Sequence, residues 1–397
     1  MLSLKKAWIY CNMKDKISIV SMASVSALGS GEEEIWGNYQ RKISLITKKP
    51  FGPFSAMVSE IPRHYSNSIE ALRNTKNYRD LDLSVLMAIY TARKAFEKSA
   101  WKQDEFGINI GSSRGATHLF EKYYKEFMEN GKGQVSTLSS PTTTLGNISS
   151  WVGHDLQSRG PVISHSIACS TALHGLLNGI AWINSGMSER FMVGGSEASN
   201  TPFTLAQMKA LKIYANDFSE FPCRSLDLEK TINTMVLGEA AAIFCLEKGL
   251  RPKALCIIEG IGYATEPLRH NISISTNADC FQKSMTMAME GMDKSDVDVI
   301  VTHAPGTIKG DQSEYNAIEK VFGKKKPALT SNKWILGHTL GASGGMSLEM
   351  AILMMKHQQF IEVPFAKAPE RPKNIEKVMI NAVGFGGNAV SVLLSLA

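Results

Sequence analysis

The sequence GPVISHSIACSTALHGLLNGIAWINSGMS, residues 160–188, contains no Asp, Glu, Lys or Arg. A membrane-spanning helix needs about 20 predominantly apolar residues. The two histidines, two asparagines and several serines and glycines make this stretch too polar for one. Residues 161–168 are typical of a buried strand, and from Cys169 onward apolar residues recur at i, i+3, i+4, i+7 and i+8, which indicates a helix. We therefore predict a buried strand and a buried helix, with Cys169 in the first turn of that helix.

The rest of the chain alternates predicted strands and helices. We expect strands at residues 16–28, 108–113, 191–195, 240–246, 255–261, 297–302, 328–331, 361–364, 377–382 and 389–395, helices at 83–98, 278–292, 311–322 and 347–357, and a loop at 136–150. This alternation favours a layered α/β architecture. A charged link near residue 250 predicts two domains, residues 1–250 and 251–397. They could be two copies of one unit, although the identity between them is too weak to show it.

Composition narrows the class of protein. Of the 397 residues 44% are hydrophobic and 20% are charged, which is typical of a folded chain with a large core. The net charge of +6 comes without a basic arm, so we expect no nucleic acid, whereas an acidic protein partner would fit. Six scattered cysteines without CxxC spacing predict reduced thiols in the cytoplasm and no metal site. We expect neither a secretory signal nor an integral membrane segment.

A few residues could carry chemistry. At the start of a buried helix, Cys169 would meet unpaired backbone amides and the positive end of the helix dipole, which stabilise a thiolate. Most free cysteines are simply small buried hydrophobes. His303 follows a predicted strand, and His338 lies in the glycine-rich stretch GHTLGASGG. The loop VGFGGN, residues 383–388, offers backbone amides to an anion or oxyanion.

Together these motifs resemble the β-ketoacyl-acyl carrier protein synthases, KAS I/II-like condensing enzymes of the thiolase superfamily. The matching segments are IACSTA (167–172), VGGSEA (193–198), VLGE (236–239), the histidine motif from His303 to Glu314, SNKWILGH (331–338) and GFGG (384–387). They occur in the family's order at matching spacings, and the resemblance extends from about residue 16 to the C-terminus. It implies an α/β, thiolase-like layered α-β-α-β-α fold with two similar halves.

The resemblance also implies an acyltransferase that performs a decarboxylative Claisen condensation. Cys169 would take an acyl chain from an acyl carrier protein, and the backbone amides of Cys169 and Phe385 would hold the oxyanion. His303 and His338 would donate hydrogen bonds to the thioester of malonyl-carrier protein. Phe385 would also gate the acyl pocket. The substrates would arrive on the phosphopantetheine of the carrier protein, with no other cofactor and no metal.

Further positions follow from the resemblance. Lys333 would support the two histidines and pair with Glu349. A gapless match puts Ser347 at that glutamate position, whereas a two-residue insertion puts Glu349 there. Thr307 and Gly386 are expected to contact the substrate.

The chain departs from the family in several places. Pro305 replaces a threonine of the histidine motif, which removes one expected pantetheine contact. Arg114 stands where the family usually has an apolar residue near the acyl pocket. Since an unpaired buried charge is costly, Arg114 would disfavour a long saturated chain and favour an unsaturated or aryl-primed one. Residues 1–15 have no family counterpart.

Several alternatives remain open. The enzyme could act as a homodimer, or as the active subunit of a heterodimer with a related ketosynthase-like chain. It could also be a non-catalytic chain-length-factor-like partner, although such subunits usually lack the cysteine that this chain has at Cys169. A thiolase would need a further cysteine near the C-terminus, and none follows Cys280. The pathway, whether fatty acid, polyketide or aryl-polyene synthesis, is left open by the sequence.

Overall fold

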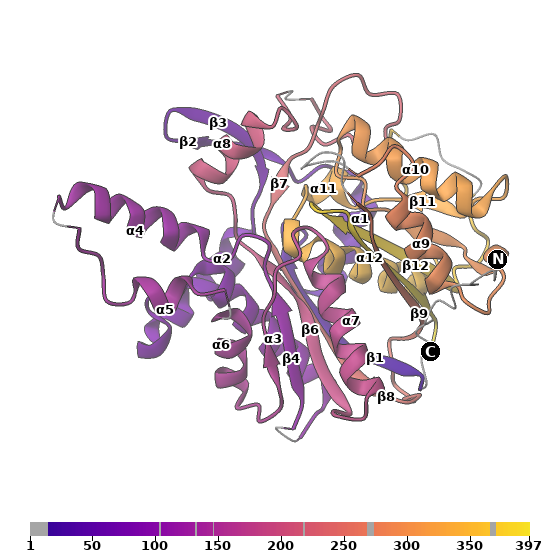
Figure 1. The fold of residues 1–397 in the computed structure, drawn as a ribbon, viewed down its shortest axis with the longest axis horizontal. Coiled ribbons are helices and arrows are strands. Elements are labelled where there is room, and N and C mark those ends of the chain that lie inside the picture. The colour runs from indigo at the N-terminus through magenta and orange to yellow at the C-terminus, as the bar shows by residue number, and fades with distance from the viewer. Residues whose placement is uncertain are drawn as a thin grey trace, which may run out of the picture.

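The computed structural model describes residues 15–397 except 103–104, 132, 146, 217–218, 268–273 and 366–370 (Figure 1). Residues 1–15, which have no counterpart in the family resemblance, therefore lie outside the described residues except for Asp15. No helix in the described part of the chain is long and apolar enough to cross a membrane. Five of the six cysteines fall within it, and all five are buried and free.

Two five-stranded sheets with the same topology form the centre of the molecule. The first has the order β1-β8-β6-β4-β5, with β1 Ile17–Ser26, β4 Gly107–Gly111, β5 Val162–Ile163, β6 Arg190–Glu197 and β8 Ala240–Lys248. The second has the order β9-β13-β12-β10-β11, with β9 Cys256–Thr265, β10 Val299–Val301, β11 Ala328–Thr330, β12 Lys377–Gly384 and β13 Asn388–Ser395. In each order the first two pairs are antiparallel and the last two are parallel. The prediction of two similar halves is therefore confirmed.

Helices lie between the sheets and on their outer faces (Figure 1). α7 (Thr171–Asn184) and α12 (Ser343–His357) each contact strands of both sheets and pack against each other. α3 (Leu83–Ser99) and α6 (Asn147–Leu156) cover the first sheet, while α9 (Asp279–Ala288) and α10 (Ile308–Phe322) cover the second. This α-β-α-β-α layering confirms the predicted fold class. It also explains why residues 160–188 lack charge, because α7 lies in the central layer.

The remaining elements lie outside the two large sheets, and one of them, α11 (Lys333–Leu336), is fully buried. β2, β3 and β7 form a small third sheet, and α4 and α5 extend from the body at the left of Figure 1. The bounds are α1 Glu32–Arg41, β2 Thr47–Phe51, β3 Phe54–Ser59, α2 Arg63–Glu70, α4 Thr117–Glu129, α5 Ser139–Thr143, α8 Pro202–Ala210, β7 Leu237–Gly238 and α11 Lys333–Leu336.

Three predicted elements differ from the structure. The strand expected at 161–168 contains only Val162–Ile163, which pair with Ile108 and Asn109 of β4. The loop expected at 136–150 contains α5 and the start of α6, whose serines and threonines concealed their helical character. No strand forms at 361–364; there the backbone amide of Ile361 contacts the sulfur of Met354, and the Ile361 carbonyl accepts a hydrogen bond from Thr330.

Candidate active site

Cys169 lies in the turn between β5 and α7, not inside the helix as predicted. α7 begins at Thr171 with Ser170 as its N-cap residue, and Cys169 is only 6% exposed. Thr171 fixes the turn, since its Oγ1 accepts from the Ile167 amide at 2.9 Å and donates to the Ala168 carbonyl at 2.6 Å. Ala168 has a φ of 44°, a left-handed conformation that delays the helix and costs about 1–3 kcal/mol in a non-glycine residue. Such strain next to a nucleophile candidate is typical of a functional turn.

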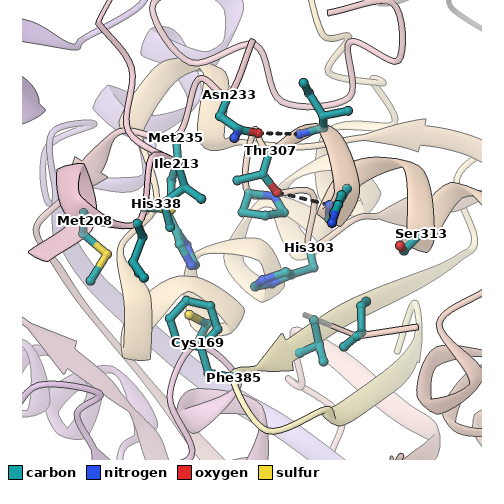
Figure 2. Close-up of a pocket in the computed structure, with 18 of the residues that line it drawn as sticks. Cys169, Met208, Ile213, Asn233, Met235, His303, Thr307, Ser313, His338 and Phe385 are labelled. Carbon is teal, nitrogen blue, oxygen red and sulfur yellow. Dashed lines mark hydrogen bonds between the residues drawn. The ribbon is translucent and has the colours of Figure 1, made fainter. Parts of the chain in front are cut away.

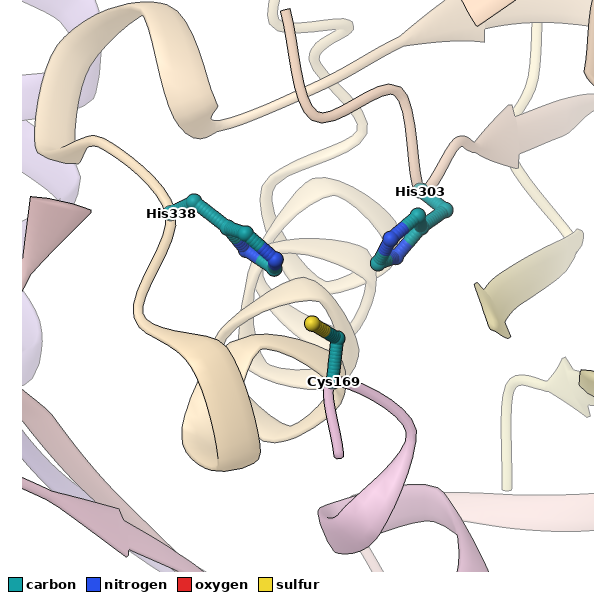
Figure 3. A group of neighbouring side chains, drawn as sticks. All are labelled: Cys169, His303 and His338. Carbon is teal, nitrogen blue, oxygen red and sulfur yellow. The ribbon is translucent and has the colours of Figure 1, made fainter. Parts of the chain in front are cut away.

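Two imidazoles reach the thiol from the second half of the molecule (Figure 3). His303 follows β10, and His338 lies in the loop between α11 and α12. Their ring centroids are 5.3 Å apart with an interplanar angle of 84°. The Cys169 sulfur and one nitrogen of each imidazole all lie within 4.8 Å of one another. Cys169 precedes α7 and His338 precedes α12, and these are the equivalent central helices of the two halves. The two residues therefore come from corresponding ends of the two halves.

The glycine-rich loop after β12 closes against the nucleophile turn. A Cβ atom on Gly384 would lie 2.5 Å from the Ile167 carbonyl oxygen, so only glycine permits this approach. The next residue, Phe385, is 48% exposed and lines the cavity described below. Gly386, with a φ of 104°, shapes the turn behind Phe385 and is not part of the cavity lining. The structure therefore places Phe385, but not Gly386, beside the thiol site.

A cavity of about 840 Å³ contains the thiol and both imidazoles in its wall (Figure 2). Much of the remaining lining is apolar, including Met208, Leu211, Ile213, Met235, Ile274, Leu340 and Val383. Thr307 lines it too and caps α10, where its Oγ1 accepts from the Gly310 amide at 3.2 Å. Asn233 holds the same turn by accepting from the Ile308 amide at 2.9 Å. An apolar wall with few fixed polar groups is typical of a site for a flexible organic ligand.

The thiol of Cys169 is protonated at rest. Burial raises its pKa to about 12, and the charge of the nearby Glu197 carboxylate adds to this effect. The positive charges of Lys333 and Arg114, together with the backbone amide of Cys169, act in the opposite direction. An attack by Cys169 therefore has to be accompanied by transfer of the thiol proton.

The imidazoles of His303 and His338 are neutral. Burial lowers the pKa of both well below the ordinary 6.5, and the charge of Lys333 lowers it further. The Nδ1 atom of each ring is buried and has no hydrogen-bond partner within the described part of the chain. Neutral imidazoles can donate one hydrogen bond each without carrying a charge.

The predicted pairing of Lys333 with Glu349 is not formed. Lys333 begins α11 and is 1% exposed; its Nζ has no hydrogen-bond partner among the described residues. Burial lowers the pKa of Lys333, and the charge of Glu314 is the largest influence in the opposite direction. Glu349 faces β1 instead, where its Oε1 accepts from Ser24 Oγ at 2.5 Å. Glu349, on helix α12, thus faces the first sheet. The carboxylate whose charge most strongly raises the pKa of Lys333 belongs to Glu314.

Glu314 also holds the His303 backbone. Its two oxygens accept from the amides of His303 and Ala304 at 2.9 and 2.8 Å, and Asn381 Nδ2 donates at 3.1 Å. These bonds fix the segment that carries the imidazole.

A buried ion pair that the sequence did not reveal anchors the same segment. Lys230 Nζ lies 2.7 Å from Asp311 Oδ2, and their side chains are only 3% and 0% exposed. Asp311 also accepts from the amides of Leu226 and Gly306, at 3.0 and 2.9 Å. Lys230 stands in a polar stretch without periodicity, so no sequence signal distinguished it from a surface lysine.

Arg114 does not line the cavity. Its positive charge acts to lower the pKa of the Cys169 thiol. Arg114 follows β4, its amide donates to Glu197 at 3.2 Å, and its guanidinium donates to the side-chain oxygen of Gln207 on α8.

The three reactive atoms could also bind a soft cation. One sulfur and two imidazole nitrogens within 4.8 Å of one another match the donor types of a zinc site. The buried Lys333 beside them opposes a second positive charge.

The fold and this thiol–imidazole site define a class of two-half α/β enzymes with a buried cysteine, and comparison with known proteins specifies the family. Residues 14–251 match the model for the β-ketoacyl synthase N-terminal domain, and residues 255–364 match that for the C-terminal domain. The chain therefore belongs to the β-ketoacyl synthase family.

Individual relatives agree with this assignment. A 3-oxoacyl-[acyl-carrier-protein] synthase 2 from Coxiella burnetii is 26% identical over 96% of this chain and 99% of its own length. The ishigamide ketosynthase/chain length factor has a TM-score of 0.83, with 20% identity over 96% of this chain and 99% of that one. A type II polyketide acyl-carrier protein in complex with its ketosynthase has a TM-score of 0.82, with 17% identity over 96% and 100% of the two chains. At such identities the two solved structures show the fold alone.

Proposed function

We propose that this protein is a β-ketoacyl-acyl carrier protein synthase, an acyltransferase that extends an acyl chain on Cys169 by decarboxylative condensation with malonyl-carrier protein. One observation carries the proposal: the Cys169 sulfur lies within 4.8 Å of a nitrogen from each of two neutral imidazoles, in the wall of a largely apolar cavity. A condensing enzyme needs these groups, a nucleophile for the acyl chain and uncharged donors for an enolate.

In the first half-reaction the Cys169 thiol attacks the acyl thioester of the carrier protein. A new C–S bond to Cys169 forms, the bond to the pantetheine sulfur breaks, and the thiol proton leaves with the pantetheine thiol. Backbone amides of Cys169 and Phe385 hold the oxyanion of the tetrahedral intermediate. The half-exposed ring of Phe385 is placed to move as the acyl chain enters.

In the second half-reaction malonyl-carrier protein loses carbon dioxide. His303 and His338 donate hydrogen bonds to its thioester carbonyl, which becomes an enolate oxygen, so they stabilise the transition state more than the ground state. The enolate carbon attacks the acyl-Cys169 carbonyl, and the released thiolate takes up one proton. Lys333 and Glu314 position the imidazoles, and Thr307 meets the phosphopantetheine arm. These steps call for neither a metal nor another cofactor.

The carrier protein docks at the cavity mouth in this proposal. Lys309 lines the main cavity, while Lys209 and Lys212 line an adjoining cavity of about 460 Å³ that shares Asn233 and Ile308 with it. These cations would attract an acidic carrier protein, and the net charge of +6 agrees in sign. The solved polyketide acyl-carrier protein complex with its ketosynthase supports such a partner. We also place the enzyme in the cytoplasm, because the five cysteines of the described part are free thiols.

We also propose a dimer, either of two copies or with a related ketosynthase-like subunit. β5 is an edge strand whose Val162 is 39% exposed, and α4 exposes Phe120, Tyr124 and Met128. An unpaired strand edge and exposed apolar side chains each favour association, and most such dimers have a two-fold axis. The ishigamide ketosynthase/chain length factor supports the heterodimer as an option.

The second candidate function is a non-catalytic, chain-length-factor-like subunit. The thiol and both imidazoles argue against it, because such a subunit has no need of them. The pathway, whether fatty acid, polyketide or aryl-polyene synthesis, depends on the acyl group that Cys169 accepts.

The test is intact-protein mass spectrometry after incubation with acyl-carrier proteins. We expect one acyl adduct on Cys169, its absence in Cys169→Ala, and its conversion to a β-ketoacyl-carrier protein when malonyl-carrier protein is added. As a matched control, Cys256→Ala changes a buried cysteine remote from the cavity lining and should retain the adduct. Absence of any adduct from a range of acyl donors would favour the structural subunit.

A further inference from the structure

One segment of the first half reaches both imidazole-bearing segments of the second half. Residues 224–238, the connecting segment, precede β8, and Asn233 and Met235 within it line the cavity (Figure 2). Thr234 lies between these two residues in sequence and is 3% exposed. It is held against the turn that follows His303, as its hydrogen bonds show.

Thr234 makes two hydrogen bonds to one carbonyl oxygen of that turn. Its backbone amide and its Oγ1 donate to the Gly306 carbonyl at 2.9 and 2.8 Å, and its Oγ1 accepts from the Arg224 amide at 3.0 Å. Gly306 has a φ of 88°, and a Cβ atom there would lie 3.1 Å from the Cys223 sulfur and 3.2 Å from the Thr234 carbonyl oxygen. The turn after His303 therefore packs closely against the connecting segment.

Two residues further on, the same segment holds the backbone of the other histidine. The His338 amide donates to the Val236 carbonyl at 2.6 Å, and the His338 carbonyl accepts from the Gly238 amide at 3.1 Å. Because Thr234 and Val236 are only two residues apart, the positions of both imidazole-bearing segments depend on one short piece of backbone.

The connecting segment is fixed to the turn after His303 at two other points. Ser225 Oγ donates to the Ala304 carbonyl at 2.6 Å, and the buried pair of Lys230 and Asp311 joins the segment to the same turn. The nucleophile turn is fixed separately, by the hydroxyl of the threonine that begins α7. The hydrogen bonds of the connecting segment therefore bear on the imidazoles more directly than on the thiol.

We propose that Thr234 is a positioning residue that sets the separation of His303 and His338 for the second half-reaction. This inference rests on the proposed condensing activity. The enolate oxygen takes a hydrogen bond from both imidazoles at once, so the rate of decarboxylation depends on the distance between them. Acylation of Cys169 uses the backbone amides of Cys169 and Phe385 for its oxyanion, so it depends much less on that distance.

The test separates the two half-reactions in one assay. An adduct is first formed on Cys169 from whichever of acetyl-, octanoyl- and cinnamoyl-carrier protein reacts fastest; malonyl-carrier protein is then added, and intact mass follows the loss of the adduct. Thr234→Val removes the hydroxyl and keeps the shape of the side chain, so we expect the second step to slow about tenfold while the first stays within about twofold of wild type. Thr234→Ser keeps the hydroxyl and should retain the wild-type rate of both steps. None of these variants alters Met235, which packs in the same apolar cluster as Cys169.

Two further variants keep the test decisive. Ser225→Ala removes another hydrogen bond to the turn after His303 and should also slow only the second step, which covers the case of a misfolded Thr234 variant. Ser21→Ala is the matched control, because it removes an equally buried hydroxyl that joins β1 to α3 by donating to the Ala95 carbonyl at 2.7 Å. It should leave the rates of both steps unchanged.

The outcomes distinguish this inference from the proposed function. If Thr234→Val slows both steps equally, or slows neither, the positioning role is wrong, while the adduct on Cys169 and its conversion by malonyl-carrier protein still support the condensing activity. Absence of an adduct from every donor in wild type would overturn both.

Discussion

Glu314 and Glu349 lie in the same half of the molecule and are 1% and 3% exposed. Burial raises the pKa of both carboxyls to about 7. Glu314 accepts three hydrogen bonds, two from the segment after β10 and one from β12. The positive charge of Lys333 acts to lower its pKa. Glu349 accepts one from Ser24, while its Oε2 has no hydrogen-bond partner among the described residues. Two equally buried glutamates thus have different surroundings, and only those of Glu314 include the imidazole segment.

The difference shows that burial alone does not identify a functional carboxylate. Glu314 joins the backbone of His303 to the buried cation, so a change there moves a reacting group. Glu349 is attached to β1 of the other sheet through one hydroxyl. We therefore expect Glu314 to act on the reaction through His303 and Lys333, as a positioning residue, and Glu349 to act mainly on stability.

The largest difference should appear when each glutamate is truncated. Glu314→Ala removes two acceptors from the His303 segment, and a displacement of this kind costs about 100-fold in rate. It also leaves Lys333 without its main counter-charge, for which about 3–5 kcal/mol of unfolding free energy is the typical cost. The measurements are kcat and KM for condensation, and urea unfolding at pH 7.

Glu349→Ala is the matched control, because it removes an equally buried carboxyl of the same half. We expect its kcat to stay within about tenfold of wild type, since its hydrogen bond within the described part of the chain goes to Ser24 and not to the imidazole segments. A loss of kcat equal to that of Glu314→Ala, at normal stability, would show that Glu349 supports the reaction as its motif position implied.

A middle-sized effect should appear in the pH dependence of stability. The folded pKa of Glu349, about 7, lies above its ordinary 4.5, so its favourable contribution is complete below pH 4.5 and is lost as pH rises through 7. The shift corresponds to roughly 3 kcal/mol. Glu349→Gln stays neutral and should therefore gain up to that amount over wild type at pH 8.5, and little at pH 4.5.

Glu314→Gln serves as the contrast for this experiment. It is also permanently neutral, but its side-chain NH2 would replace an oxygen that accepts a backbone amide from His303 or Ala304, so we expect no gain at pH 8.5. The measurement is the free energy of unfolding of wild type, Glu349→Gln and Glu314→Gln in urea at pH 4.5 and pH 8.5. Equal gains for both amide variants would mean that the two backbone hydrogen bonds accepted by Glu314 contribute little to stability.

Sequence spacing was enough to bring the reacting atoms together. The motifs around Cys169, His303 and His338 each follow a predicted strand or precede a predicted helix, and the structure unites them in one cavity. Spacing failed for Lys333, because its counter-charge comes from α10 and not from the helix that follows it. Lys230 was missed for the same reason, since only tertiary packing shows that it is buried against Asp311.

The sequence predicted the central strands and helices of the fold better than the short strand β5 and the start of α7. Buried strands and central helices have strong periodicity, whereas the stretch that contains β5 was predicted as a longer strand than the two residues that form it. The left-handed φ of Ala168 shifted the start of α7 beyond Cys169, and an alanine gives no sign of this conformation. The division into domains 1–250 and 251–397 stays a prediction.

The smallest difference should appear when each glutamate loses one donor. Ser24→Ala removes the hydroxyl that bonds Glu349, and Asn381→Ala removes one of three donors to Glu314. Because a buried acceptor left without a partner costs about 1–3 kcal/mol, Ser24→Ala should destabilise the fold by about that amount at pH 8.5, with kcat unchanged. Asn381→Ala should also be destabilising, because Asn381 accepts a hydrogen bond from the buried Ser391 hydroxyl, so kcat is the quantity that separates the two variants. Asn381→Ala leaves two backbone donors in place and should lower kcat only about two- to threefold, through a looser His303 segment. Urea unfolding and steady-state kinetics on both variants separate the two effects: a fall in kcat confined to Ser24→Ala would reverse the roles assigned to the two glutamates.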